Sequence, residues 1–409
     1  MTEISGISVI MNNIQVKAID LFSGCGGVSC GLTHTGFEVV AAVEIDPAAV
    51  RTYKNYHKFS NVNMIEKDIC ELTGQDILTA GGIGKNDLYL LAGCPPCQNF
   101  SFQNRENKNK SEDERKKLLF QFQKIILEML PPFVLMENVP GIVSKSKKVD
   151  ENDIPQVSNK EILDAFISGL SNDSRPENER YYVISDVLNA ANYGVPQLRK
   201  RYVLHAVRID IYKILKEKGI IFELPKPSHN ENGDNGLEKW STVRDVIEDL
   251  PPIEQGKIYT DPKKKIHNHR CARLSDINLK RMELIRNNGG LRTCLPEDLI
   301  LDCHKKTRED GTVYNGHKDV YGIMEYDKPS PTITGGCLCY TKGRFGHPTQ
   351  NRAISVREAA RLQTFPDDFI FEDLVTSAGL QIGNAVPVKL VEASGREFTR
   401  YFNALNEKC

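Results

Sequence analysis

The stretch "VKAIDLFSGCGG", Val16 to Gly27, decides how the rest of the sequence is interpreted. Its apolar first half is typical of a buried strand, and the glycine cluster that follows is typical of a tight turn. The next residues, "VSCGLTHTG", predict a helix that ends at Gly36. A strand, a glycine turn and a helix in this order let the backbone approach a ligand at the helix N-terminus. We therefore expect a ligand site at this turn.

Strand-like and helix-like segments alternate through the first half of the chain. After the glycine turn, the segments "FEVVAAVEID", "DLYLLAG" and "FVLMENVPG" predict strands, and "RKKLLFQFQKIILEML" predicts a helix. This alternation indicates an α/β fold with a mostly parallel sheet covered on both faces. Ligands of such sheets bind beyond the carboxyl ends of the strands, where the glycine cluster, Glu44, the segment Cys94 to Cys97 and Glu137 all fall.

The glycine pattern favours a nucleoside cofactor without phosphates. The dinucleotide fingerprint G-x-G-x-x-G needs a third glycine, and Ser29 stands at that position. S-adenosylmethionine is the commonest nucleoside cofactor of this kind. Glu44 follows Gly24 by the spacing at which an acid binds ribose hydroxyls, and Asp68 is placed to accept from an adenine amino group. An ordinary turn with two surface acids remains the alternative.

Three interpretations compete for Cys94 and Cys97 in "GCPPCQNFS". A redox pair is expected ahead of a helix in a small thioredoxin-like fold, whereas this pair precedes the polar loop "QNRENKNKSEDE". A zinc half-site needs a second close pair, and the remaining cysteines and histidines have no familiar ligand spacing, so we expect no metal. A nucleophilic cysteine at the end of a strand beside a cofactor turn is the third interpretation.

Composition places the chain among cytosolic globular proteins. It has 409 residues, a formal net charge of -1 and 11 cysteines, with no secretory signal and no apolar run that could span a membrane. Reduced thiols are therefore expected. The chain also contains a local basic block, which is either a solvated face or a surface for nucleic acid. Its members are Lys263, Lys264, Lys265, Arg270, Arg273, Lys280, Arg281 and Arg286.

Taken together, the motifs resemble those of the DNA cytosine-5 methyltransferases, in the bacterial modification methylase type. They occur in the family's order as "DLFSGCGG", "EID", "GCPPCQNFS", "ENVPG", "GVPQLRKR", "REAARLQTFPD" and "IGNAVP". The likeness covers residues 18 to 207 and about 329 to 400. Seven motifs in order are far more specific than any one of them.

The resemblance implies the roles of individual residues. The catalytic residues would be Cys97 as nucleophile, Glu137 as the acid at the cytosine edge, and Arg199 and Arg201 near the flipped nucleotide. Cys94 matches no catalytic position. The S-adenosylmethionine site, which would release S-adenosylhomocysteine, would comprise Phe22, Ser23, Gly24, Gly26, Gly27, Glu44, Ile45, Asp68, Ile69, Pro96, Asn384 and Val386.

The resemblance also implies a domain plan and partners. Residues 16–207 would form the first part of a Rossmann-like catalytic domain, residues 208–328 a smaller irregular target recognition domain, and residues 329–409 a return to the catalytic domain with a C-terminal helix that closes the cofactor site. Duplex DNA is the expected substrate. The enzyme is expected to be a monomer in the bacterial cytoplasm, associated with the nucleoid and not with a membrane. A restriction endonuclease that acts independently can accompany it. A tRNA methyltransferase of the same family is the main alternative. A nucleoside-binding protein without catalysis and a thiol oxidoreductase are more remote.

Overall fold

The computed structural model describes residues 16–96, 111–144, 158–302, 305, 319–371 and 374–407, with the side chains of 111–115 excepted. The chain divides into two compact units. The first unit contains the chain up to residue 189, residues 200–227 and residues from 388 onward, and the second contains residues 190–199 and 228–387. The chain therefore passes between the units at residues 190, 200, 228 and 388.

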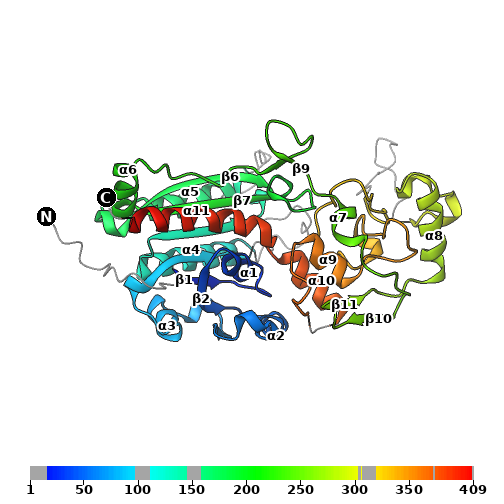
Figure 1. Ribbon diagram of the computed structural model, residues 1–409, viewed down its shortest axis with the longest axis horizontal. Helices are drawn as coiled ribbons and strands as arrows, with labels where there is room; N and C mark the ends of the chain where they lie inside the picture. Colours follow the sequence, from blue (N-terminus) through cyan, green and yellow to red (C-terminus); the bar gives the residue numbers. More distant parts are fainter. Residues whose placement is uncertain are drawn as a thin grey trace, which may run out of the picture. The chain divides into compact units, whose positions relative to one another are not determined.

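A sheet forms the centre of the first unit (Figure 1). It has seven strands in the order β3-β2-β1-β4-β5-β7-β6. Its strands are β1 (Val16–Leu21), β2 (Phe37–Val43), β3 (Asn63–Ile65), β4 (Leu88–Gly93), β5 (Phe133–Asn138), β6 (Tyr181–Asn189) and β7 (Lys200–Arg208). The pairs among β1 to β5 are parallel, whereas β7 is antiparallel to both β5 and β6. The predicted α/β class and mostly parallel sheet are confirmed.

The direction of the strands brings distant parts of the sequence to one edge of the sheet. Because β1, β2, β4 and β5 are parallel, their carboxyl ends share that edge. β7 runs the other way, so that its first residues, Lys200 and Arg201, lie at the same edge as the last residues of β5, with Asn138 paired to Tyr202. The sheet thus places the glycine turn, Glu137 and Arg201 at one edge.

Helices pack against the sheet because its strands are apolar on both faces. The helices of this unit are α1 (Gly27–His34), α2 (Pro47–Asn55), α3 (Gly74–Ala80), α4 (Ser111–Met129), α5 (Asn159–Leu170), α6 (Ile209–Glu217) and α11 (Val388–Asn406). α4 contacts α3 and α5, and α11 contacts α1 and α6. β4 is buried along its whole length, as is typical of a central parallel strand.

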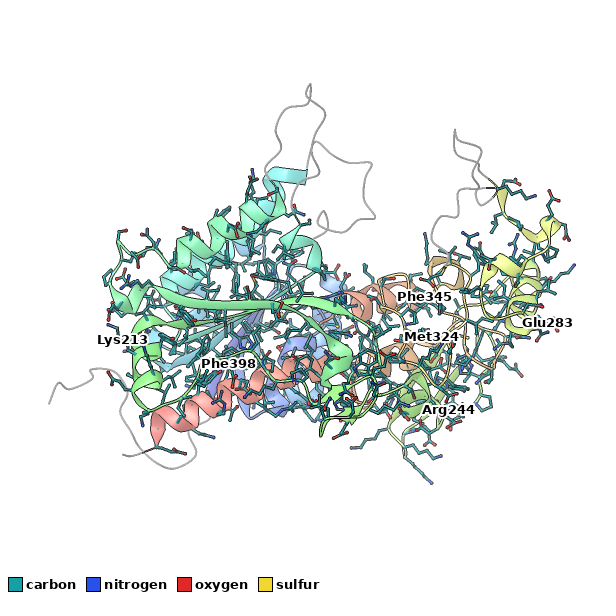
Figure 2. The ribbon with its side chains drawn as sticks, turned by 90° about the horizontal axis from the view of Figure 1, so that it is seen from above. Lys213, Arg244, Glu283, Met324, Phe345 and Phe398 are labelled. Carbon is teal, nitrogen blue, oxygen red and sulfur yellow. The ribbon has the colours of Figure 1, made fainter. Side chains whose placement is uncertain are left out.

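α11 covers one face of the sheet through aromatic rings. The ring of Phe133 on β5 lies 5.6 Å from that of Phe398 and 5.6 Å from that of Tyr401, and both of these belong to α11. Phe222 adds a ring 6.2 Å from Phe133. Figure 2 labels Phe398 among the side chains of this helix. These contacts explain why residues 208–227, predicted to begin the recognition domain, pack with the first unit.

The second unit has little regular structure among its described residues. Its helices and strands are α7 (Val243–Ile247), α8 (Asp276–Asn287), α9 (Val356–Leu362), α10 (Val375–Asn384), the pair β8 (His229–Asn230) and β9 (Glu238–Lys239), and the hairpin β10 (Ile258–Asp261) and β11 (Ile266–Arg270). Short strands and long connections were expected here. α8 was not, because its mixed polar sequence carries no clear apolar period. Residues 329–387, predicted to return to the catalytic domain, pack within this unit.

A buried ion pair anchors the start of α9. Arg352 donates to both carboxylate oxygens of Glu358 at 2.7 and 2.6 Å, and each side chain is 1% exposed. Burial raises the pKa of Glu358, but hydrogen bonds and charge from Arg352 outweigh it and lower the pKa to about 2. Ser355 caps the helix reciprocally with Glu358. Within the described parts of the chain, no helix is long and apolar enough to cross a membrane.

Candidate active site

The glycine turn, residues 22–27, connects β1 to α1 in a strained backbone. Phe22, Gly24 and Gly26 have φ angles of 58°, 55° and 102°. A Cβ at Gly26 would lie 2.6 Å from the ring of Phe59 and 3.0 Å from that of Tyr53, so no other residue fits there. A left-handed conformation is uncommon at a phenylalanine and typical of functional sites. Gly27 follows as the first residue of α1.

A buried aspartate on β1 holds the start of α1. Gly26 is the N-cap and has no side chain to cap the helix. Asp20 supplies the missing acceptor, because its Oδ2 accepts from the backbone N–H of Ser29 at 3.1 Å and from the Ser29 hydroxyl at 2.6 Å. The Ser29 hydroxyl in turn lies 2.7 Å from that of Tyr53. Asp20 was not among the predicted site residues, although a charged residue within an apolar strand was an available signal.

Burial raises the pKa of Asp20 to about 7, and the charge of Glu44 adds to the rise, although hydrogen bonds from Ser29 oppose it. An unfolded aspartate releases its proton near pH 3.8. The folded chain therefore binds this proton more tightly than the unfolded chain does. Proton binding at Asp20 adds to the unfolding free energy at acid pH, and this contribution is lost as the pH rises through about 7.

We expect Asp20→Asn to remove this pH dependence. Between pH 5 and pH 7 the wild type should lose about 2 kcal/mol of unfolding free energy relative to the variant. Urea unfolding of both proteins at several pH values measures the difference. Glu71→Gln, at an exposed carboxylate, serves as the control and should follow the wild type. A constant difference between wild type and Asp20→Asn would show that Asp20 is ionised throughout.

Glu44 fixes the turn that follows β2. Its Oε2 accepts from the N–H of Gly24 at 2.8 Å, and its Oε1 accepts from the N–H groups of Ile45 at 2.9 Å and Asp46 at 2.8 Å. The carboxylate therefore joins the ends of β1 and β2. Ile45 beside it is 63% exposed, so its apolar side chain is open to contact with a ligand.

Ser23 and Asp68 complete this part of the site. Ser23 is 6% exposed, and its hydroxyl has no hydrogen-bond partner among the described residues. Asp68 accepts from the N–H of Cys70 at 2.9 Å and precedes the buried Ile69. An unsatisfied buried hydroxyl, an acceptor carboxylate and an exposed isoleucine fit the polar and apolar groups of the predicted nucleoside cofactor.

Glu137 and Arg201 form an ion pair at the same edge of the sheet. Arg201 Nε lies 2.9 Å from Glu137 Oε1, and each side chain is 12% exposed. The neighbouring Asn138, buried on β5, donates from Nδ2 to the carbonyl of Pro95 at 3.3 Å. This bond ties β5 to the segment after β4, where Cys94 is half-buried and Pro96 is exposed. Cys97, the predicted nucleophile, lies outside the described residues.

Arg199 has a different environment from Arg201. It is 2% exposed, and its guanidinium donates to the carbonyls of Ile333, Gly383 and Ala385 at 2.5, 2.9 and 3.0 Å. These partners all belong to the second unit, as does Arg199 itself. Arg199 therefore holds the chain on both sides of Asn384, which is exposed at the end of α10. Val386 follows and is 6% exposed.

The structure thus sorts the predicted site residues into groups. The first unit brings together the glycine turn, Glu44 and Ile45, and it pairs Glu137 with Arg201. The second unit contains Arg199, Asn384 and Val386.

The basic block also divides by environment. Arg281 and Arg286 fit neither interpretation of the block, because both donate to backbone carbonyls of their own unit, Arg281 to Leu299 at 2.9 Å and Arg286 to Gln350 at 2.7 Å. Arg281 is only 7% exposed. The turn of the β10–β11 hairpin, by contrast, leaves Lys263, Lys264 and Lys265 exposed. The exposed members of the block are these lysines together with Arg273 and Lys280.

The C-5 cytosine-specific DNA methylase family model matches residues 16–400. The Type II methylase M.HgiDII of Herpetosiphon aurantiacus is 35% identical over 394 residues, which cover 95% of this chain and 97% of that protein. The Type II methyltransferase M1.HphI of Haemophilus parahaemolyticus is 32% identical, with coverage of 93% and 86%. A prophage-encoded E. coli protein described as a DNA modification methyltransferase has a similar fold, with a TM-score of 0.64, 23% identity and coverage of 95% and 99%.

Proposed function

Because the chain belongs to the C-5 cytosine-specific DNA methylase family, and so is a type II DNA (cytosine-5-)-methyltransferase that uses S-adenosylmethionine, we propose that Cys97 and Glu137 carry its chemistry. The observation that supports this assignment is the arrangement of Glu137, Arg201 and Asn138 at one edge of the sheet. Asn138 fixes Pro95, and Cys97 follows two residues later in the sequence.

The chemistry requires a nucleophile and an acid on the same cytosine. Carbon 5 is too weak a nucleophile to accept a methyl group directly, so the Cys97 thiolate adds to carbon 6 and makes carbon 5 electron-rich. Glu137, in its protonated form, gives a proton towards N3, which neutralises the charge that this addition creates, and N3 returns that proton when the adduct collapses. S-adenosylmethionine, when bound, supplies the methyl group as an electrophile. A base then removes the carbon 5 proton, the thiolate leaves carbon 6, and the cysteine is regenerated.

Residues around these two groups would bind and orient the substrates. The cytosine has to leave the duplex, at a cost of a few kcal/mol, before the thiolate can reach carbon 6. Arg201 holds the Glu137 carboxylate at the edge of the sheet where the extruded base would bind. Glu44 and Asp68 would bind the ribose and adenine of the cofactor, the Ser23 hydroxyl would gain a partner, and Ile45 would pack on the adenine. Arg199 would act by positioning the Asn384 loop.

The comparisons favour DNA over tRNA as the substrate. The family model and the relatives above 30% identity are DNA methylases or type II enzymes. Tritium transfer from labelled S-adenosylmethionine to duplex DNA and to tRNA tests this directly. Transfer to tRNA alone would reverse the assignment. Transfer to neither would favour a thiol oxidoreductase or a nucleoside-binding protein without catalysis.

We assign target recognition to the second unit, in which the sequence-based recognition domain, residues 208–328, mostly falls. The turn of the β10–β11 hairpin carries three exposed lysines in succession, and Asp261 holds its backbone by accepting from the N–H groups of Lys263 and Lys264 at 3.0 and 3.2 Å. A rigid basic turn of this kind is suited to phosphate contacts.

Replacing Lys263, Lys264 and Lys265 together by alanine should weaken binding to all duplexes alike. Each phosphate contact that is lost lowers the slope of log affinity against log salt by about 0.9, so the slope should fall by about 2 to 3. Binding titrations at several salt concentrations on target and scrambled duplexes measure it. Lys85→Ala, before β4 and so at the opposite edge of the sheet from the site, is the control. An unchanged slope in the triple variant would assign the lysines to a solvated face.

We further propose that the enzyme acts as a monomer in the bacterial cytoplasm, on nucleoid DNA, and protects that DNA from a cognate endonuclease that works independently. Type II relatives support the pairing with an endonuclease. Resistance of methylated host DNA to restriction enzymes of known specificity would identify the partner's target.

A further inference from the structure

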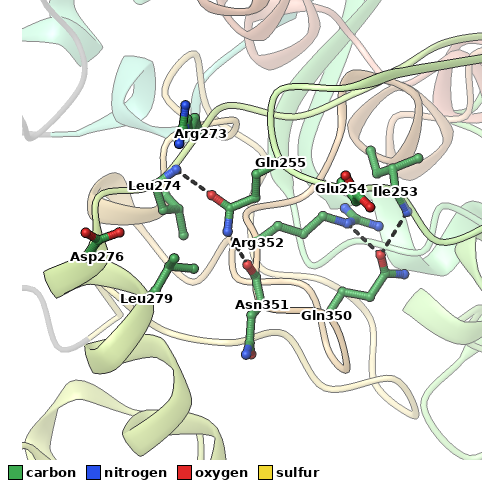
Figure 3. A pocket seen from close by; sticks show the side chains of 10 residues that line it. All are labelled: Ile253, Glu254, Gln255, Arg273, Leu274, Asp276, Leu279, Gln350, Asn351 and Arg352. Atoms are coloured by element: carbon green, nitrogen blue, oxygen red, sulfur yellow. Dashed lines mark hydrogen bonds between the residues drawn. The ribbon is translucent and has the colours of Figure 1, made fainter.

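A polar pocket of about 380 Å³ opens in the second unit beside the N-terminal end of α8 (Figure 3). Residues from three separate segments line it, and its polar side chains include Glu254, Gln255, Arg273, Asp276, Gln350 and Arg352. The pocket presents a guanidinium, amides and carboxylates together.

Hydrogen bonds fix the walls of this pocket. Gln255 accepts from the N–H of Leu274 at 2.6 Å and donates to the carbonyl of Asn351 at 2.5 Å, so its amide connects two of the segments. Arg352 donates from Nε to Gln350 Oε1 at 2.8 Å, and its other nitrogens bind the buried Glu358. The backbone on either side is therefore rigid, and Arg273 adjoins the residue that Gln255 holds.

Arg273 is uncommitted, unlike the other arginines that the structure describes in this unit. Its side chain is exposed and has no ion pair or hydrogen bond with the described residues. The others have interaction partners: Arg199, Arg244, Arg270, Arg281, Arg286, Arg292, Arg344, Arg352, Arg357 and Arg361. A free guanidinium next to a fixed backbone is ready for an external ligand.

The acids of the pocket decide what that ligand can be. Glu254 and Asp276 are exposed on the same lining, and two carboxylates repel a phosphate group. The edge of a base pair, in contrast, presents acceptors and amino donors side by side. An arginine binds the O6 and N7 acceptors of guanine with two parallel hydrogen bonds, which is the commonest base-specific contact, and a carboxylate accepts from the amino group of cytosine.

We infer that Arg273 reads a guanine in the target sequence and that Gln255 positions it. This inference rests on the proposed recognition role of the second unit. Arg273 sets specificity at one base position, whereas the lysines of the hairpin turn contribute binding that is independent of sequence.

The test compares the methylated sequences of variants. Each protein is incubated with a library of random duplexes and labelled cofactor. The proteins are the wild type, Arg273→Ala, Arg273→Lys and the control Lys280→Ala. Lys280 is an exposed residue of the same block outside the pocket lining. Sequencing the methylated products gives the base preference at each position. Thermal melting and S-adenosylmethionine binding confirm that each variant is folded.

We expect Arg273→Ala to lose about 5- to 150-fold in kcat/KM on the wild-type target, the equivalent of one bidentate base contact, and to accept other bases at one position that is guanine for the wild type. Arg273→Lys should relax the same position, because an ammonium keeps the charge but not the planar pair of donors. Lys280→Ala should keep the wild-type preference.

Three outcomes would overturn the inference. An unchanged base preference in Arg273→Ala would remove it from recognition, and an equal loss on all sequences would make it a phosphate contact. Full specificity in Arg273→Lys would show that charge alone suffices. If the wild type itself methylated no duplex, the failure would lie with the proposed function.

Discussion

Cys97→Ser should abolish methyl transfer while leaving S-adenosylmethionine and DNA bound. A serine hydroxyl is a far weaker nucleophile than a thiolate and cannot add to carbon 6 at a useful rate, yet it differs from a thiol by a single atom and hardly changes the surface that binds the base. Tritium transfer and equilibrium binding of each substrate measure the two parts of this result.

A covalent readout separates the nucleophile from its neighbour. With a duplex that carries 5-fluorocytosine, the carbon 5 proton is replaced by fluorine, so the adduct cannot be resolved and the protein stays attached to DNA in denaturing gels. Wild type and Cys94→Ser should both form this adduct, and Cys97→Ser should not. If the adduct instead followed Cys94, which is half-buried directly after β4, the assignment of the nucleophile would be wrong.

Glu137→Gln should reduce kcat by about 10² to 10⁴, the usual contribution of a positioned general acid. The amide keeps the size of the side chain and can still hydrogen-bond to the base, but it cannot release a proton. DNA binding should survive. Single-turnover methylation at saturating DNA and cofactor measures the chemical step.

The ion pair with Arg201 calls for a second variant. Glu137→Gln also removes the partner of a guanidinium that is only 12% exposed, so part of its effect could arise from a displaced Arg201. Arg201→Gln breaks the same pair from the other side and leaves the acid in place. An acid role requires Glu137→Gln to lose substantially more in the chemical step than Arg201→Gln. A loss below tenfold in Glu137→Gln would remove it from the mechanism.

Local patterns were enough to predict the parallel half of the sheet and the glycine turn. Apolar runs such as Leu88–Gly93 are buried on both faces, and their uninterrupted apolar composition predicts that burial. The turn was predictable because Gly26, with a φ of 102° and a close contact with Phe59, leaves no room for a side chain.

Long-range packing accounts for what the sequence did not reveal. Phe222 joins the first unit because it meets rings from β5 and α11, and nothing in its local sequence indicates those partners. Arg281 and Arg286 look like DNA ligands when only charge is counted, although carbonyls brought in by the fold occupy them. Asp20 escaped prediction for the same reason, because its role depends on a hydrogen bond with Ser29, nine residues away at the start of α1.

The four passages of the chain between the units bear on how the protein is made. The aromatic face of the sheet around Phe133 is covered by α11, whose first residue is Val388, while Phe222 is synthesised long before it. At about 5 to 20 residues per second, the ribosome needs roughly 8 to 30 s to pass from residue 227 to residue 388. During that interval the nascent sheet exposes an apolar surface of the kind that chaperones bind and that aggregates. A ribosome that stalls within the second unit therefore holds a nascent chain with an uncovered core for longer, and translation speed through residues 228–387 becomes a determinant of the yield of active enzyme.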